Sequence, residues 1–388
     1  MFPSEFVKML GEDLGEERAA KVLEGLEREP LVSVRVNPFK MTLEGLREHF
    51  GAVAGEPVEW AAGEAFYLTE RPSFTLDPVF HAGGYYVQEA SSMYVGGMFD
   101  KAVEGLAEPR VLDLCAAPGG KTTQILSHLG GRGHLVANEV IGSRVAILAE
   151  NVAKWGCPNV TVTNSDASVL AAAYRGREQF DVVVVDAPCS GEGMFRKGDV
   201  AVKNWSPGNV NLCAQRQRRI VSDIWPALRD GGYIIYSTCT FNHFEDEDNV
   251  AWIAEDLGAE VLSQRHFYPG LDQGEGFFVA MLQKIRTDAS DSRSVRKDAR
   301  SGSGMTLRVF RSEFAEADEA LSIGLDRSKY TTVELSREDA LKFLAKEPLV
   351  FRQAAGAYTA DIQRFSLRIR KKSRPPLQQS PPYAPAYP

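Results

Sequence analysis

Apolar strands alternate with helical stretches between residues 109 and 284, and this alternation constrains the fold more than any other feature of the chain. The predicted strands are VLDLC (111–115), HLVANE (134–139), NVTVTNSD (159–166), FDVVVVDA (180–187), GYIIYSTC (232–239) and GFFVAMLQK (276–284), and the predicted helices lie at 119–129, 143–155 and 211–228. Strands this apolar are buried on both faces, as in a parallel sheet covered by helices. The sequence therefore predicts an α/β fold.

Length and composition limit the remaining possibilities. The chain has 388 residues, 44% of them hydrophobic and 10% aromatic, so we expect two or three domains. No apolar run approaches the roughly 18 residues of a membrane span, and residues 1–17 are acidic and amphipathic, unlike a signal peptide. We therefore expect a cytoplasmic protein without membrane association. The net charge of −8 gives no overall attraction to nucleic acid, so any such binding must depend on local basic patches.

Changes in composition divide the chain into five predicted segments. They are an N-terminal subdomain (1–105) with a strand at 31–40, the alternating domain (106–285), a polar serine-rich linker (286–304), a small C-terminal module (305–370) and a proline-rich, disordered tail (371–388). The C-terminal module contains predicted strands at 306–310 and 330–335, followed by a helix that Ser336 opens with Asp339 three residues later.

The segment LDLCAAPGGKTTQ (112–124) leaves a strand, turns through small residues and enters a helix. This geometry directs free backbone N–H groups at a ligand beside the carboxyl end of the strand. GGKT resembles a P-loop, but that motif requires a glycine where Cys115 stands, which disfavours a nucleotide triphosphatase. Glu139 ends the second strand and can grip ribose hydroxyls, while Asp166 ends the third and can accept from an adenine amino group. Helix capping or solvation is the alternative for either acid, but together they favour an adenosine-type cofactor.

The cysteines are five in number and widely spaced, at 115, 157, 189, 213 and 239, which argues against a disulfide framework and against closely spaced zinc ligands. Cys189 follows one predicted strand and Cys239 ends another, so we expect two separate strands to bring thiols to one place. We expect Cys157 and Cys213 to be packing residues. For Cys115 we expect a packed side chain beside a backbone that lines the cofactor site.

Three motifs, DLCAAPGGKT, DAPCSGEG and YSTCTF, occur in this order. Together they resemble the signature of the Sun-type (NOL/NOP/Sun) RNA cytosine-5 methyltransferases, and within that family the branch that modifies small-subunit ribosomal RNA. The resemblance runs from about Val34 to Lys284. It implies a Rossmann-like class I S-adenosylmethionine-dependent methyltransferase sheet, with an N-terminal α+β subdomain and a small PUA-like RNA-binding module at the C-terminus. It also implies S-adenosylmethionine as cofactor, bound by the residues Cys115, Ala116, Ala117, Pro118, Gly119, Gly120, Lys121, Glu139, Asp166 and Asp186.

The chemistry of cytosine explains the thiols. Carbon 5 is a poor nucleophile until a soft nucleophile adds at carbon 6, and a thiolate suits that addition. The resemblance implies that Cys239 is the nucleophile and that Cys189 assists the breaking of the bond between carbon 6 and the Cys239 sulfur. It also implies that Asp186 holds the ring by N3 and the exocyclic amine. A free cysteine is only a few per cent thiolate at pH 7. We name Lys121 and Arg196 as cations that can lower its pKa.

DNA cytosine-5 methyltransferases use the opposite assignment, because their nucleophile follows a proline as Cys189 does. The second thiol, in YSTCTF, favours the RNA type. A target base must leave its stack to reach a buried thiol, so we expect a flipped or single-stranded cytidine. We expect cations and an aromatic residue of MFRKGDVAVKNW (194–205) and RQRR (216–219) to contact phosphates or stack on a base, although a solvated helix face is the alternative.

Two regions depart from the family pattern. The acidic run FEDED (244–248) follows the nucleophile, and helix initiation and solvation explain it adequately. The match of the C-terminal module fades beyond Gly356. The chain is thus predicted to be a monomeric enzyme that methylates a cytidine in 16S ribosomal RNA. Transfer RNA as substrate, and a non-catalytic RNA-binding assembly factor, are the alternatives.

Overall fold

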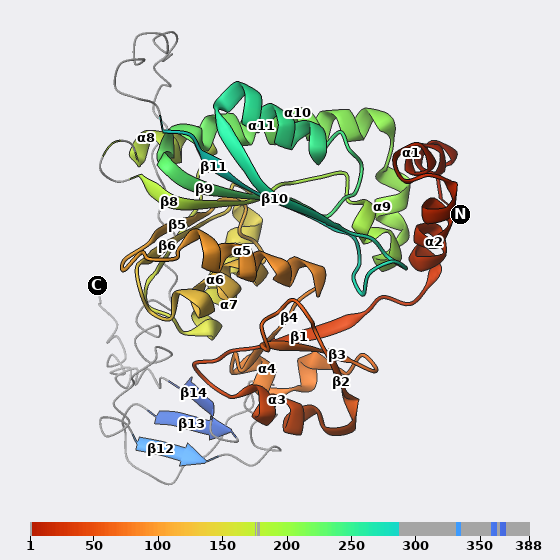
Figure 1. Ribbon diagram of the computed structural model, residues 1–388. Helices are drawn as coiled ribbons and strands as arrows, with labels where there is room; N and C mark the ends of the chain where they lie inside the picture. The colour runs from red at the N-terminus through yellow and green to blue at the C-terminus, as the bar shows by residue number, and fades with distance from the viewer. Residues whose placement is uncertain are drawn as a thin grey trace, which may run out of the picture.

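The computed structural model describes residues 2–174, 176 and 179–286 with their side chains, and three further strands, at 331–334, 358–362 and 365–369, by their backbone pairing. A seven-stranded sheet forms its centre (Figure 1). Its strands are β5 (Arg110–Asp113), β6 (His134–Asn138), β7 (Val160–Thr163), β8 (Phe180–Asp186), β9 (Leu228–Thr238), β10 (Ala259–Phe267) and β11 (Phe277–Lys284).

The order of these strands is β10-β11-β9-β8-β5-β6-β7, and the five strands from β7 to β9 are parallel. From β5 the chain builds outward to β6 and β7, then returns to the other side of β5 with β8 and β9. The sheet therefore has its switch point between β5 and β8, where crevices for ligands form beyond the carboxyl ends of the strands. This is a Rossmann-like α/β fold, as the alternation predicted.

The expectation of a parallel sheet is wrong for β11, which is antiparallel to both of its neighbours. The preceding strand, β10, was not predicted at all. β10 and β11 are joined by the short connection 268–276, and so short a link can join only antiparallel neighbours, because a parallel crossover needs a dozen or more residues. The missed strand β10 thus explains the error.

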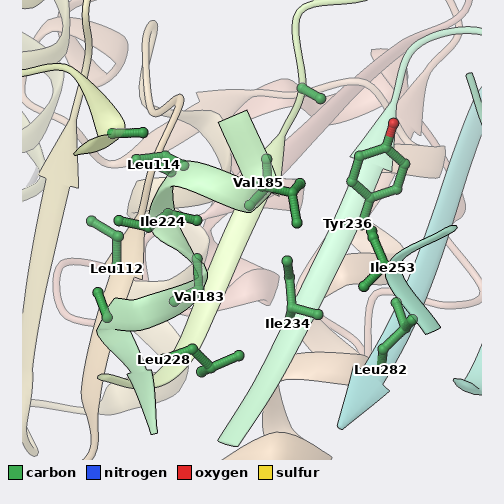
Figure 2. Close-up of a cluster of buried hydrophobic side chains, with 14 of the residues drawn as sticks. Leu112, Leu114, Val183, Val185, Ile224, Leu228, Ile234, Tyr236, Ile253 and Leu282 are labelled. Carbon is green, nitrogen blue, oxygen red and sulfur yellow. The ribbon is translucent and has the colours of Figure 1, made fainter. Parts of the chain in front are cut away.

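Helices cover both faces of the sheet (Figure 1). One layer contains α8 (Ala167–Ala173), α10 (Pro207–Ile224) and α11 (Glu247–Leu257), and the other contains α5 (Tyr94–Ala102), α6 (Gly120–Leu129) and α7 (Gly142–Trp155). Successive valines of β8 point to opposite layers: Val183 and Val185 join the first, Val182 and Val184 the second. Figure 2 shows the first of these cores, which Ile224, Ile234 and Ile253 help to fill. A strand buried on both faces explains the run of four valines.

The N-terminal residues pack in two different places. A four-stranded sheet of order β2-β3-β1-β4 and helices α3 and α4 form one unit, whereas α1 and α2 lie beside α9 (Figure 1). These elements are α1 (Ser4–Leu14), α2 (Glu16–Glu27), β1 (Val32–Val36), α3 (Leu43–Phe50), β2 (Ala54–Pro57), β3 (Ala65–Leu68), α4 (Pro78–His81), β4 (Tyr85–Val87) and α9 (Asp199–Asn204). Short 3-10 turns are η1 (Gly51–Val53), η2 (Phe74–Leu76), η3 (Ser91–Met93), η5 (Glu192–Lys197) and η6 (Trp225–Ala227).

The C-terminal strands are β12 (Thr331–Glu334), β13 (Tyr358–Ile362) and β14 (Phe365–Ile369). β12 pairs with β13 in parallel, and β13 with β14 in antiparallel fashion. Several predicted features lie outside the described residues. They are the linker beyond residue 286, the strand at 306–310, the helix opened by Ser336 and the tail at 371–388. Across the described parts of the chain, no helix has the length and apolarity to span a bilayer.

Candidate active site

A cavity of about 460 Å³ opens at the carboxyl ends of β5, β8 and β9. The predicted cofactor loop contributes Cys115, Ala116, Ala117, Pro118, Gly120 and Lys121 to its wall, and β8 and β9 contribute Asp186 and Cys239. The remaining wall comes from Tyr86, Val87, Gln88, Glu89, Ser92, Asp113, Arg144, Gly193, Met194, Lys197, Glu275, Gly276 and Phe277. Eight of the twelve predicted cofactor or catalytic positions therefore share one cavity with residues of the N-terminal sheet, and Gly119, Glu139, Asp166 and Cys189 are not among its lining residues.

The cofactor loop is fixed at both of its ends. Gly119 caps α6 with a φ of 115°, a backbone conformation that side chains other than glycine rarely adopt, and its carbonyl accepts from the Thr123 N–H. The Ala116 N–H donates to the Asn138 carbonyl at 2.8 Å, which ties the loop to β6. The first turn of α6 thus presents its free N–H groups to the cavity.

Two buried carboxyl oxygens at this edge have no hydrogen-bond partner. Asp113 is fully buried; its Oδ2 accepts from the Thr122 hydroxyl at 2.6 Å, but its Oδ1 has no donor. Glu139 is 2% exposed; its Oε1 accepts from the Ile141 N–H, and its Oε2 lies 3.2 Å from Arg144 without a hydrogen bond. Buried acceptors of this kind require donors. The amino and hydroxyl groups of an adenosine-type cofactor can supply them, so the residues fit such a group.

Asp113 was missed by the sequence analysis, although it precedes the cysteine of the DLC motif. Burial is the main cause that raises its pKa to about 7, and the charges of Asp186 and Glu139 add to this. Asp166 lies differently: its Oδ1 caps α8 by accepting from the Ser168 N–H, and it does not line the cavity. A contact of Asp166 with adenine remains a prediction.

The two thiols meet. The Sγ atoms of Cys189 and Cys239 lie 3.0 Å apart, one after β8 and one after β9. Cys239 lines the cavity and Cys189 is not among the lining residues. The hydrogen bond with Cys239, burial and the charge of Glu245 raise the pKa of Cys189 well above its usual value. Cys189 is therefore held as a neutral thiol behind Cys239.

The other three cysteines are placed as packing residues would be. Cys157 and Cys213 are buried, and burial raises the pKa of their thiols to about 12 and about 11. Cys115 lines the cavity and also packs against the sheet core, and burial raises its pKa.

The two cations named from the sequence, Lys121 and Arg196, both pair with carboxylates. Lys121 Nζ lies 2.9 Å from Asp186 Oδ1, and the same oxygen accepts from the Ser237 hydroxyl at 2.9 Å. The side chain of Arg196 is 4% exposed and pairs with Glu275, while it also donates to the carbonyls of residues 28, 29 and 274. The idea that Arg196 lowers the pKa of a thiol is therefore wrong, because its charge serves a buried ion pair.

The segment 194–205 divides between the cavity and the core. Met194 and Lys197 are exposed and line the cavity. Trp205 is 5% exposed, and its indole N–H donates to Glu192 at 2.9 Å. The expectation that this aromatic residue stacks on a base is wrong, since its ring packs inside the protein. On α10, Arg219 is largely exposed and lies 3.8 Å from Asp223.

The acidic run after the nucleophile matches the expected solvated helix start only in part. Glu247 and Asp248 open α11 and are partly exposed, as expected. Glu245 and Asp246, however, are fully buried. Glu245 accepts from the Ser190 N–H at 3.0 Å and from Gln217 at 2.7 Å, and Asp246 accepts from the Thr238 hydroxyl at 2.6 Å. The expectation is wrong for these two residues because consecutive acids are usually exposed, and only donors from distant segments make their burial tolerable.

The strand order, the glycine-containing loop and the orphaned acceptors together define a Rossmann-like methyltransferase of the S-adenosylmethionine-dependent class. Comparison with known proteins specifies the family. Residues 102–283 match 16S rRNA methyltransferase RsmB/F, and residues 2–90 match the N-terminal domain of 16S rRNA methyltransferase RsmF. The chain belongs to this family of 16S rRNA methyltransferases, which confirms the resemblance that the motifs carried.

Several relatives support this assignment. The chain is 37% identical over 278 residues to ribosomal RNA small subunit methyltransferase F of Cronobacter sakazakii, covering 65% of this chain and 56% of that protein. It is 36% identical over 309 residues to the protein of the same name from an Enterobacter species, covering 73% and 63%. The chain thus spans about three fifths of the length of these relatives. A solved methyltransferase homologue from Pyrococcus horikoshii has a TM-score of 0.64 and 27% identity, over 73% of this chain and 96% of that one.

Proposed function

We propose that the protein transfers a methyl group from S-adenosylmethionine to carbon 5 of a cytidine in 16S ribosomal RNA. The observation that carries this proposal is the 3.0 Å approach of the Cys189 sulfur atom to that of Cys239, which lines one cavity together with Asp186. A single strand-end cysteine is commonly a packing residue. Two that converge beside a carboxylate in a cofactor cleft suit covalent chemistry on a pyrimidine.

The cofactor supplies a methyl group bound to a sulfonium centre, which is electrophilic. The loop from Cys115 to Lys121 would hold it by backbone N–H groups. Glu139 would accept from the ribose hydroxyls and Asp166 from the adenine amino group, while Asp113 Oδ1 offers a buried acceptor for an ammonium group. Asp113 and Glu139 are buried, and a buried setting strengthens such contacts.

In the proposed reaction, the Cys239 thiolate adds to carbon 6 of the cytosine, and the electrons of the carbon 5–carbon 6 double bond move into the ring. Asp186 holds the ring at N3 and the exocyclic amine, and its contact with Lys121 at 2.9 Å fixes its orientation. Carbon 5, now enamine-like, would attack the methyl carbon, and the sulfur–methyl bond would break with its electrons remaining on the sulfur, which departs as a neutral thioether.

Release reverses the addition. A base removes the carbon 5 proton, the double bond re-forms, and the Cys239 sulfur leaves carbon 6 with its bonding electrons. Cys189, held as a thiol 3.0 Å away, can hydrogen-bond to the departing sulfur and protonate it. This arrangement explains why the second thiol lies behind the first and does not line the cavity.

The names of the relatives support 16S ribosomal RNA as substrate. We further propose that residues 305–370 form a PUA-like module that binds RNA, that residues 1–105 form an RNA-side subdomain, and that residues 106–285 form the methyltransferase domain. We expect a monomer that acts in the cytoplasm. Transfer RNA is the alternative substrate.

Adduct trapping with single variants tests the roles of the thiols. RNA that contains 5-fluorocytidine should form a denaturation-resistant adduct with the wild type and with Cys189→Ala, but not with Cys239→Ala. The reverse pattern would exchange the two roles. Bisulfite sequencing of cellular RNA with and without the gene identifies the cytidine; a missing mark in transfer RNA only would overturn the ribosomal assignment, and no lost mark would favour a non-catalytic factor.

A further inference from the structure

Glu192 lies three residues after Cys189, and its buried carboxyl group reaches into the loop that follows Cys239. Its Oε2 accepts from the Thr240 hydroxyl at 2.5 Å and from the Phe241 N–H at 3.0 Å. Its Oε1 accepts from Asn242 at 3.1 Å and from the indole of Trp205. One carboxyl group of the first thiol loop therefore takes four donors, three of them from the second.

Glu245 makes the converse connection. It lies six residues after Cys239, is fully buried, and accepts from the Ser190 N–H at 3.0 Å, next to Cys189. The amide nitrogen of Asn242 donates to Glu245 at 3.0 Å as well as to Glu192. Each thiol loop thus sends a carboxyl group into the other, and one asparagine joins the two.

The backbones of these loops also touch. The Gly193 N–H donates to the Cys239 carbonyl at 2.9 Å. A Cβ atom at Gly193 would lie 2.3 Å from the carbonyl oxygen of Gly276, which precedes β11, and real contacts are not this close. It would also make a tight contact of 3.0 Å with the Cys239 carbonyl oxygen. Gly193 therefore holds the first thiol loop between the second thiol loop and the segment before β11, and few arrangements of the thiols satisfy all of these contacts.

We propose that Glu192 and Glu245 form a reciprocal carboxyl clamp that sets the distance and orientation between Cys189 and Cys239, and that both are positioning residues for the covalent step. Neither carboxyl group lines the cavity, so neither contacts the substrate. Burying two carboxyl groups is costly, and burial raises the pKa of both. If Glu192 and Glu245 served only to fill space, apolar side chains of similar volume would make the protein more stable. Their presence therefore points to a positioning role.

The inference rests on the proposed cytidine chemistry, but its first test needs neither RNA nor cofactor. Diamide oxidises two adjacent thiols to a disulfide and takes up both hydrogen atoms. The rate at which the Cys189–Cys239 disulfide forms, measured by mass spectrometry of the joined peptides, reports how often the sulfur atoms meet. In Glu192→Gln and Glu245→Gln an amide N–H₂ must face the donors that surround these positions. The charge of Glu245 raises the pKa of Cys189, so its removal alone would increase the thiolate fraction and speed the reaction. We therefore compare rates per thiolate and expect them to fall at least about tenfold.

The matched control is Asp77→Asn. Asp77 is a partly buried carboxylate of the N-terminal sheet unit that bonds His49, Tyr85 and the Val79 N–H, far from the thiols in the fold. It should lose stability and keep the wild-type rate of disulfide formation. Equal rates in the folded clamp variants and in the wild type would overturn the proposal.

Thr240 keeps the test decisive where a glutamate variant fails to fold. Thr240→Val removes the hydroxyl donor to Glu192 at constant shape, whereas Thr240→Ser retains it. With RNA and cofactor present, the valine substitution should lower kcat by roughly 10²-fold with little change in the KM for RNA, because misplacement of a reacting group by about 1 Å has that effect. The serine substitution should restore both kcat and the disulfide rate. A valine variant with wild-type values for both would refute the clamp, whereas a slowed disulfide rate without any methylation would leave the clamp and reject the proposed function.

Discussion

Replacement of Arg35 by methionine should destabilise the protein and loosen the cofactor loop. Arg35 lies in β1 and is completely buried. Its guanidinium donates to Gln88 at 2.8 Å, to Thr123 at 2.7 Å and to the Gly120 carbonyl at 3.3 Å, and it lies 4.7 Å from the centre of the Trp155 ring. Burial lowers its pKa to about 10, so it remains charged at neutral pH.

The magnitude follows from these contacts. Two short hydrogen bonds from a charged donor are worth about 1.5–3 kcal/mol each, and the stacked ring adds about 0.5–2 kcal/mol. Such contributions are not additive, and Gln88 and Thr123 each lose a buried donor at a cost of about 1–3 kcal/mol. The free energy of unfolding of Arg35→Met should therefore fall by about 3–5 kcal/mol. Loss of the contact with the Gly120 carbonyl, about 1 kcal/mol, should weaken S-adenosylmethionine binding about fivefold.

Urea denaturation and calorimetric titration with the cofactor measure the two effects. Arg28→Met is the control, because the Arg28 side chain is 60% exposed and its pairing with Glu24, one helical turn away, is worth little. A stability loss in Arg35→Met below about 1 kcal/mol, or equal to that of the control, would show that the N-terminal sheet does not brace the cofactor loop through this residue.

Three further predictions concern other parts of the molecule. The folded-state pKa of Asp113, about 7, exceeds its ordinary value of 3.8, so the stability that its protonated form contributes is complete below pH 3.8 and is lost as the pH rises to 7. Between pH 5 and pH 8, the free energy of unfolding of Asp113→Asn, measured in urea, should therefore rise by about 3 kcal/mol relative to that of the wild type. Parallel curves of stability against pH for the two proteins would contradict this. Phe6→Ala should lower the free energy of unfolding by about 3–5 kcal/mol in calorimetry, since Phe6 is fully buried against Phe195 at 5.0 Å, and a loss no larger than that of Val7→Ala would be inconsistent with this packing. Lys197→Gln should weaken RNA binding, and each lost phosphate contact should reduce the slope of log K against log salt concentration by roughly 0.7, as measured by titration at several salt concentrations. Lys203 does not line the cavity, so Lys203→Gln should leave both the affinity and the slope unchanged.

The sheet was readable because its strands are apolar on both faces. The bounds of β5, β6 and β8 follow the predicted strands closely, since Val, Ile and Leu runs between helical stretches have few alternative folds. β9 begins at Leu228, four residues before the predicted strand. β10 escaped notice because its residues from Glu260 to Gln264 are exposed, as befits an edge strand, and its pattern resembles that of a polar loop. Because β10 was not predicted, the antiparallel edge that it forms with β11 was not predicted either.

The site was readable to the extent that its chemistry lies in contiguous motifs. The cofactor loop, Asp186 and both thiols occur in short segments whose residue types suit the reaction. The charges that surround them were not readable. Arg196 looked like a cation for a thiol or a phosphate and is instead buried against Glu275, because its partner comes from a segment almost 80 residues away.

By itself, the sequence determined the alternation of strands and helices, the loop that turns into α6, and the two thiols at the ends of separate strands, because each of these depends on residues that are neighbours along the chain. Only the tertiary structure decided that the sulfur atoms lie 3.0 Å apart, that Cys239 faces the cavity with Cys189 behind it, and that Glu192 and Glu245 are buried between their loops. The physical reason is that a buried charge is tolerable only where several donors converge on it, and those donors come from strands and helices that the linear order does not place together.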